Sequence, residues 1–268
     1  MKNCSRGIFP ILATALVLGI FAGAKPVKAQ SLGITYFSIA ANDKDANVMC
    51  CGVSNNYVLS GLGANGLPVY NTGATATSGS IFTPNDLIAG NQISWWSPSL
   101  NNGGSGGTSD VTETGTGTVS LPYDNNSFFA PNGTGSCDGP SPCDGYEAAI
   151  LDGTLDAPTA ESISFAVGSD DMAFVYLDGS IVCDDGGVHG STSVPCTTPG
   201  TISAGDHSIE VFYVDLNQSQ AVLDFSITTA NITTTPPSSG AAPEPSSLIL
   251  LGTGLVGAFG AFRRRFVH

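Results

Sequence analysis

Five aspartates lie in the stretch GSDDMAFVYLDGSIVCDDGGVHG, residues 168–190, and four of them form two adjacent pairs. Asp170 and Asp171 precede an apolar run, and Asp184 and Asp185 follow a second, shorter one. Ionised neighbouring carboxylates repel one another, and a cation between them removes that repulsion. Ca2+ takes about six to eight oxygen ligands from carboxylates, carbonyls and water. The stretch is therefore a candidate calcium site.

Two other interpretations of Asp170 and Asp171 stay open from the residues alone. Aspartates at turns and strand ends commonly accept hydrogen bonds from backbone amides. Paired carboxylates also hydrolyse glycosides when they face each other across the sugar at about 5–10 Å. Adjacent residues of a strand point to opposite faces of the sheet, so this pair alone does not make such a site. Because no base–nucleophile arrangement stands out either, we expect no catalytic residues.

A second acidic stretch, DKDAN, fails the test for an EF-hand loop. Asp43, Asp45 and Asn47 match its first three ligand positions. The glycine required at the sixth position is Val48, and the glutamate required at the last is Ser54. We predict a turn here.

Both ends of the chain carry export signals. Residues 1–29 combine a basic start, an apolar run and a small-residue cleavage site, and they predict a secretory signal helix, with an uncleaved anchor as the alternative. Near the other end, residues 248–262 are apolar and three arginines follow. A helix of that length rises about 22 Å, short of the ~30 Å hydrocarbon core, but with Ser246 and Ser247 it could nearly span the membrane, its arginines on the cytoplasmic side. We predict a short transmembrane tail.

The body between these ends is acidic and contains an even number of cysteines. Residues 30–245 hold Lys44 as their only base against 22 acids, a net charge of −21, which excludes nucleic acid as a partner. Six cysteines in an exported chain indicate disulfides whose connectivity the sequence does not determine. Local bridges are favoured, with the candidate cysteines being Cys137, Cys143, Cys183 and Cys196.

The body predicts an all-β fold. Short β-rich runs such as SISFAV, MAFVYLDG and HSIEVFYVDL alternate with turn residues, which is typical of an antiparallel β-sandwich. Residues 101–118 read as a long flexible loop. Trp95 and Trp96 could offer a sugar platform, although adjacent strand residues cannot both face one surface. We divide the chain into residues 1–29 (signal), 30–230 (sandwich, core 160–228), 231–242 (Pro/Ser/Thr-rich linker) and 243–268 (sorting segment).

The C-terminal segment resembles the PEP-CTERM sorting signal. It carries Pro243, Glu244 and Pro245, then the apolar helix, then Arg263, Arg264 and Arg265. The resemblance implies an exosortase-type sorting enzyme as a partner. It also implies transient anchoring in the inner membrane and a final place at the cell surface or in the extracellular matrix of a Gram-negative bacterium. A plain membrane anchor is the alternative.

The stretch FAVGSDDMAFVYLDGSIVCDDGGVHG resembles protective-antigen-type, jelly-roll-like β-sandwich domains, above all their fibro-slime subgroup. ISAGDHSIEVFYVD, LGANGLPVYN and NSFFAPNGTG extend the resemblance over most of residues 32–228. In the lectin-like members, which include yeast flocculins, a cis peptide joins the two aspartates, so that both carboxylates point at one calcium ion that also holds sugar hydroxyls.

Carried over residue by residue, the resemblance implies a calcium site. Its carboxylates would be Asp170, Asp171 and Asp215, and its backbone carbonyls would be those of Asn217 and Ser219. Asp184 and Asp185 are possible additional ligands. The chain has Asp215 where many lectin members have Asn, and its 215–220 loop has no aromatic residue to stack on a sugar.

The sequence thus predicts an exported calcium-dependent carbohydrate-binding or adhesion protein, with extracellular polysaccharide or another glycan as its partner and a role in biofilm. Two alternatives remain. One is a ligand-free structural component of the exopolysaccharide matrix, and the other is a secreted glycan-active enzyme.

Overall fold

The computed structural model describes residues 30–46, 48, 52–77, 79–103, 108–125, 145–217 and 221–237. It confirms the all-β, antiparallel prediction, because two antiparallel sheets face each other across an apolar core. Within these residues no helix has the length and apolar character needed to cross a membrane. The predicted signal helix (1–29) and sorting segment (243–268) lie outside the described residues.

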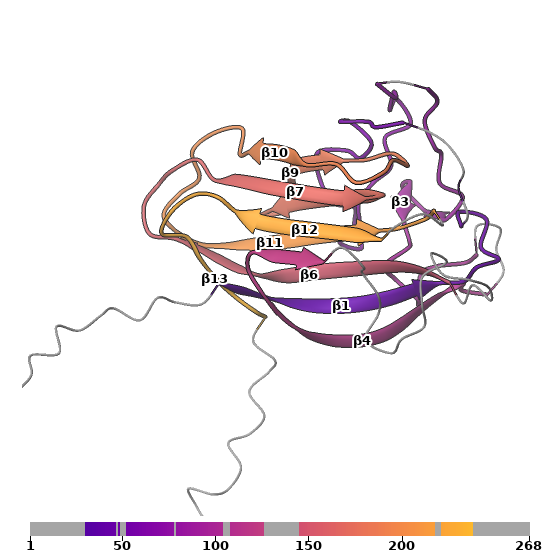
Figure 1. The fold of residues 1–268 in the computed structure, drawn as a ribbon, viewed down its shortest axis with the longest axis horizontal. Coiled ribbons are helices and arrows are strands. Elements are labelled where there is room, and N and C mark those ends of the chain that lie inside the picture. Colours follow the sequence, from indigo (N-terminus) through magenta and orange to yellow (C-terminus); the bar gives the residue numbers. More distant parts are fainter. Residues whose placement is uncertain are drawn as a thin grey trace, which may run out of the picture.

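In Figure 1 the larger sheet extends from β4 at the bottom of the sandwich to β9 near the top, where the view overlays it with strands of the smaller sheet. The larger sheet runs in the order β4 (Val111–Ser120), β1 (Ser31–Ile39), β6 (Tyr146–Ala157), β11 (Gly205–Val214), β8 (Met172–Leu177) and β9 (Ser180–Asp185), with β13 (Thr233–Thr235) paired to β6. The smaller sheet runs β10 (Val194–Thr197), β7 (Ser164–Asp170), β12 (Val222–Ile227) and β5 (Tyr123–Asn125). A short hairpin joins β2 (Leu87–Ile88) to β3 (Gln92–Ile93).

Strand β8 is buried on both faces, which explains its continuous apolar sequence. Alternate residues point to opposite sides of a strand. Val175 belongs to the core between the two sheets, whereas Phe174 packs on the other side. That other side is covered by the described parts of residues 41–101, which we call the loop layer.

Two buried tryptophans pack side by side in the loop layer, and Trp96 joins this layer to the large sheet. Trp95 is 0% exposed and Trp96 is 3% exposed. The Trp96 indole N–H donates to the carbonyl of Tyr213 in β11 at 2.7 Å, and its ring packs against Phe212. The prediction of a sugar platform at these residues is therefore wrong, because both rings are buried in the apolar cluster between the large sheet and the loop layer.

Two predictions about the strands need correction, and one strand, β6, was not predicted. Part of the predicted flexible loop 101–118 forms the edge strand β4. Most threonines of this strand are exposed, but their β-branched side chains favour an extended backbone. Strand β6 was missed because Asp152-Gly153 reads as a turn. The linker predicted to begin at 231 contains β13, which pairs with β6, so the sandwich extends beyond residue 230.

The hairpin and disulfide around β9 agree with the sequence. Asp178 and Gly179 both have positive φ, as a tight two-residue turn between β8 and β9 requires. Cys183 in β9 is bonded to Cys196 in β10, with Cα atoms 5.5 Å apart, which confirms this local bridge. It joins the edges of the two sheets. Cys137 and Cys143 lie outside the described residues.

Removing the Cys183–Cys196 bridge should lower the free energy of unfolding. A closed loop of this length restricts the unfolded chain, which corresponds to about 3 kcal/mol. Urea denaturation of Cys183→Ala/Cys196→Ala against the parent measures the difference. An unchanged unfolding midpoint would show that the bridge contributes nothing to the sandwich.

Candidate metal centre

The chain passes from the small sheet to the large one at Asp170 and Asp171. Asp170 is the last residue of β7, and β8 begins directly after Asp171. The peptide bond between the two aspartates is cis, as the resemblance implies. Asp215 follows β11, the neighbour of β8 in the large sheet. Two sheets thus bring three carboxylates to one place.

The three carboxylates form one compact, buried group. One oxygen from each of Asp170, Asp171 and Asp215 lies within 4.8 Å of the others. The residues are 2%, 1% and 0% exposed. Carboxylates this deep need either hydrogen bonds, protons or a cation to offset the loss of hydration.

Backbone amides supply part of that compensation. Asp171 accepts from the amides of His189 at 3.2 Å and Leu216 at 2.7 Å. Asp170 accepts from the amide of Ser191 at 3.1 Å. The loops after β9 and β11 therefore fold over the aspartates and fix their orientation.

Burial raises the pKa of Asp171 to about 7, with a contribution from the charge of Asp170 and against the opposing hydrogen bonds from the Leu216 and His189 amides. Burial, followed by the charges of Asp215, Asp171 and Asp170, also raises the pKa of Tyr213 well above its ordinary value. The Tyr213 hydroxyl donates to the carbonyl of Asp170 at 2.8 Å. The region thus disfavours further negative charge and favours a positive ion.

Comparison with known families settles what kind of domain surrounds these residues. Residues 133–240 match the PA14 domain, and residues 241–265 match the PEP-CTERM protein-sorting motif. The chain carries a PA14 domain. The sorting motif that follows it indicates an exported, cell-surface protein.

Solved structures similar to the chain include PA14 and adhesin domains. The PA14 domain of the antifreeze protein MpAFP is 17% identical, with a TM-score of 0.29 over 37% of this chain and 57% of that chain. A PA14 sugar-binding domain from an RTX adhesin is 14% identical, with a TM-score of 0.34 over 77% and 95%. The Epithelial Adhesin 9 A domain of Candida glabrata, in complex with Galb1-4GlcNAc, is 11% identical, with a TM-score of 0.32 over 76% and 85%. No curated protein matched the chain.

Asp184 and Asp185 stand outside the carboxylate group of the PA14 domain. Asp184 accepts from the amide of Val58 at 3.0 Å, so it ties β9 to the loop layer. Asp185 accepts from the hydroxyls of Ser169 at 2.8 Å and Thr192 at 2.7 Å. Asp185 therefore holds the loop after β9, whereas Asp184 holds the loop layer.

His189 has a packing role beside this group. Its ring nitrogen Nε2 lies 3.4 Å from Asp185 Oδ1, and its backbone amide is one of the donors to Asp171. This agrees with a structural interpretation of the GGVHG loop.

The other predicted ligands are only partly described. The amide of Asn217 donates to Asp215 Oδ1 at 3.1 Å, and its side-chain amide donates to the carbonyl of Val48 at 2.8 Å. Ser219 lies outside the described residues, as do Pro243, Glu244, Pro245, Arg263, Arg264 and Arg265.

Sequence reasoning missed Glu147. It lies on the unpredicted strand β6, is 0% exposed, and its backbone carbonyl accepts from the amide of Asp215 at 2.8 Å. A buried glutamate beside the cluster adds to the negative character of this end of the PA14 domain. Only knowledge of the β6–β11 pairing could have placed it there.

Asp184→Asn should weaken the pH dependence of stability in the presence of a chelator. Burial raises the pKa of Asp184 from 3.8 to about 7 in the folded chain. As the pH rises from about 4 to about 7, the unfolded chain releases this proton before the folded chain does, so the parent loses stability over that window. Melting temperatures measured across this pH range give the slope of stability against pH. Asp171 and His207 are present in both parent and variant, so their contributions to this slope cancel in the comparison. Equal slopes would contradict the buried, protonated state of Asp184.

Proposed function

We propose that this chain is a calcium-dependent carbohydrate-binding module that acts in adhesion at the cell surface. The observation that carries the proposal is the meeting of the carboxylates of Asp170, Asp171 and Asp215 within 4.8 Å, all buried. The body of the chain contains Lys44 as its only lysine or arginine, so side-chain cations are scarce. A divalent cation relieves the repulsion that these residues would otherwise experience.

The geometry favours binding over catalysis. Carboxyl groups of glycosidases stand about 5–5.5 Å apart in retaining enzymes and further apart in inverting ones, with the sugar between them. Here the oxygens lie closer together and are buried under loops. One cation fits such a cluster better than a sugar ring does.

The glycan part of the proposal rests on the family. An RTX adhesin carries a PA14 domain described as sugar-binding, and the epithelial adhesin domain was solved with a disaccharide. In the chain described here the bound ion would offer open coordination positions to sugar hydroxyls. The ligand would be an extracellular polysaccharide or a related glycan.

The PEP-CTERM motif supports the place of action. The proposed route is export, transient anchoring in the inner membrane by the C-terminal segment, and processing by an exosortase. The protein would then meet its glycan at the cell surface or in the matrix, where calcium-binding modules typically work with dissociation constants of about 10⁻⁴–10⁻³ M.

Asp170→Asn should weaken calcium binding by on the order of tenfold or more, because calcium affinity follows the number of charged ligands. The asparagine keeps an oxygen that can accept from the Ser191 amide, so folding in chelator should be preserved. Isothermal calorimetry of the exported chain measures binding, with the exposed Asp206→Asn as the matched control. Equal calcium affinity in parent and Asp170→Asn would sink the proposed site.

Glycan binding should require calcium. A screen of the exported chain on a glycan array, in calcium and in chelator, should show spots that vanish in chelator and in Asp170→Asn. Calcium binding without any glycan signal would leave the ion as a structural element of a matrix protein. Spots that persist in chelator would place the sugar away from the ion.

A further inference from the structure

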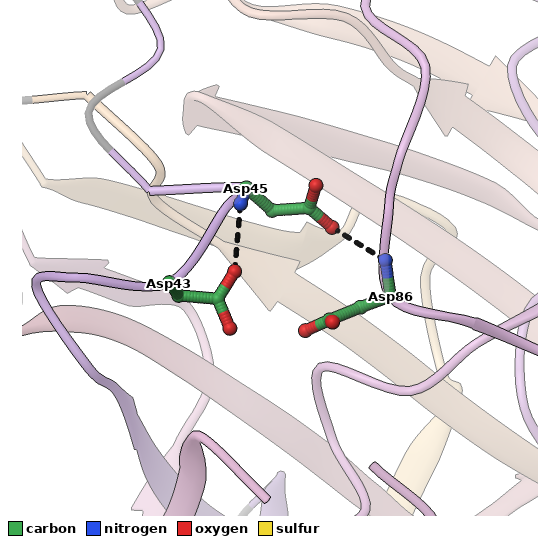
Figure 2. Close-up of side chains that lie close together, drawn as sticks. All are labelled: Asp43, Asp45 and Asp86. Carbon is green, nitrogen blue, oxygen red and sulfur yellow. Dashed lines mark hydrogen bonds between the residues drawn. The ribbon is translucent and has the colours of Figure 1, made fainter. Parts of the chain in front are cut away.

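A second group of buried carboxylates lies in the loop layer, outside the residues that match the PA14 domain. Asp43 and Asp45 belong to the turn that the DKDAN stretch predicted, and Asp86 directly precedes β2. Figure 2 shows the three side chains converging from two segments of the chain. One oxygen from each lies within 4.8 Å of the others.

Asp45 is satisfied by hydrogen bonds. Its Oδ1 accepts from the backbone amide of Asn85 at 2.6 Å and from the Asn85 side chain at 2.8 Å. Its Oδ2 accepts from the amide of Asp86 at 2.9 Å and from the indole N–H of Trp95 at 2.9 Å. Asp45 therefore joins the two segments and sets where Asp86 stands.

Asp43 and Asp86 are only half satisfied. Asp43 Oδ1 accepts from the amide of Asp45 at 2.6 Å, and Asp86 Oδ2 accepts from the side chain of Asn101 at 2.7 Å. The remaining oxygens, Asp43 Oδ2 and Asp86 Oδ1, are buried and accept from no donor on another residue, so a proton on one of the two carboxyl groups is what could join them by a hydrogen bond. The residues are 6% and 0% exposed. In Figure 2 the carboxylates of Asp43 and Asp86 point toward each other.

No basic side chain offsets this charge among the residues that the structure describes. Lys44 stands between Asp43 and Asp45 in sequence but is exposed, and the ion pairs found in the described part of the chain involve only histidines elsewhere. Burial, then the charge of Asp43, raises the pKa of Asp86 to about 7. Two buried, unpartnered oxygens that face each other need either a shared proton or a cation.

We propose that Asp43 and Asp86 hold a second divalent cation of the calcium type, with Asp45 positioning the two segments and adding its charge. Ca2+ accepts carboxylates from distant parts of a chain and completes its shell with water and carbonyls. The ion would clamp the 41–46 turn to the segment that carries Trp95.

This clamp would bear on the candidate metal centre. The chain leaves the turn and reaches Val48, whose amide donates to the carbonyl of Leu216 at 2.9 Å and whose carbonyl accepts from Asn217. These residues directly follow Asp215. The second ion would therefore help to hold the loop that covers the first.

The test uses the exported full chain with the first centre removed, as Asp170→Asn/Asp171→Asn. In this background Tb3+ should still bind and emit on excitation of tryptophan, because Trp95 contacts Asp45 directly. Calorimetry should still detect one Ca2+ per chain. Adding Asp43→Asn/Asp86→Asn should remove at least nine-tenths of the emission and the calcium heat, while Asp206→Asn should remove neither.

Three outcomes decide the proposal. Loss of all calcium binding in Asp170→Asn/Asp171→Asn alone would overturn the second site and leave the first standing. Binding that survives in the fourfold variant would overturn it as well. If the fourfold variant fails to fold, single Asp43→Asn in the same background replaces it, and unchanged Tb3+ emission there would also overturn the proposal, because the ion would then be bound without Asp43. If Asp170→Asn/Asp171→Asn still bound two calcium ions per chain, the result would contradict the site at Asp170, Asp171 and Asp215 and would leave the second site untouched.

Discussion

The structure depends on one electrostatic constraint, namely that the buried aspartates pair with no lysine or arginine in the part of the chain that the structure describes. Among residues 30–245, Lys44 is the only lysine or arginine, and histidines are the only other side chains that can become cations. Carboxylates that leave water must then find backbone amides, protons or metal ions. In the loops around Asp170 and Asp171, the backbone amides of His189 and Leu216 donate hydrogen bonds to the Asp171 carboxylate. They leave a group of oxygens for which a hard cation is the natural complement.

The architecture places this chemistry where three layers meet. The chain crosses between the sheets at Asp170 and Asp171, and Asp215 ends the neighbouring strand of the large sheet. The loop layer packs on the outer face of that sheet through Trp96, while the Cys183–Cys196 bridge joins the edges of the two sheets. Rigid strands thus carry the aspartates, and loops supply the amides that orient them.

Local patterns in the sequence predicted much of this arrangement. The preference for a local disulfide follows from the short spacing of Cys183 and Cys196, and the resemblance to known domains brought Asp170, Asp171 and Asp215 together. Strand β6 was hidden by a dipeptide that usually turns the chain. The approach of Asp86 to Asp43 joins segments separated by about forty residues, so no spacing rule could reveal it. Pairings between distant loops are fixed by packing and are absent from local periodicity.

The central claim is that one cation lies among Asp170, Asp171 and Asp215. A crystal structure of the oxidised chain grown in calcium, with anomalous diffraction data, tests it directly. The account predicts an anomalous peak at bonding distance, about 2.3–2.6 Å, from carboxylate oxygens of all three aspartates. A map with no peak there, and with aspartate oxygens joined only by hydrogen bonds to each other or to water, would contradict it.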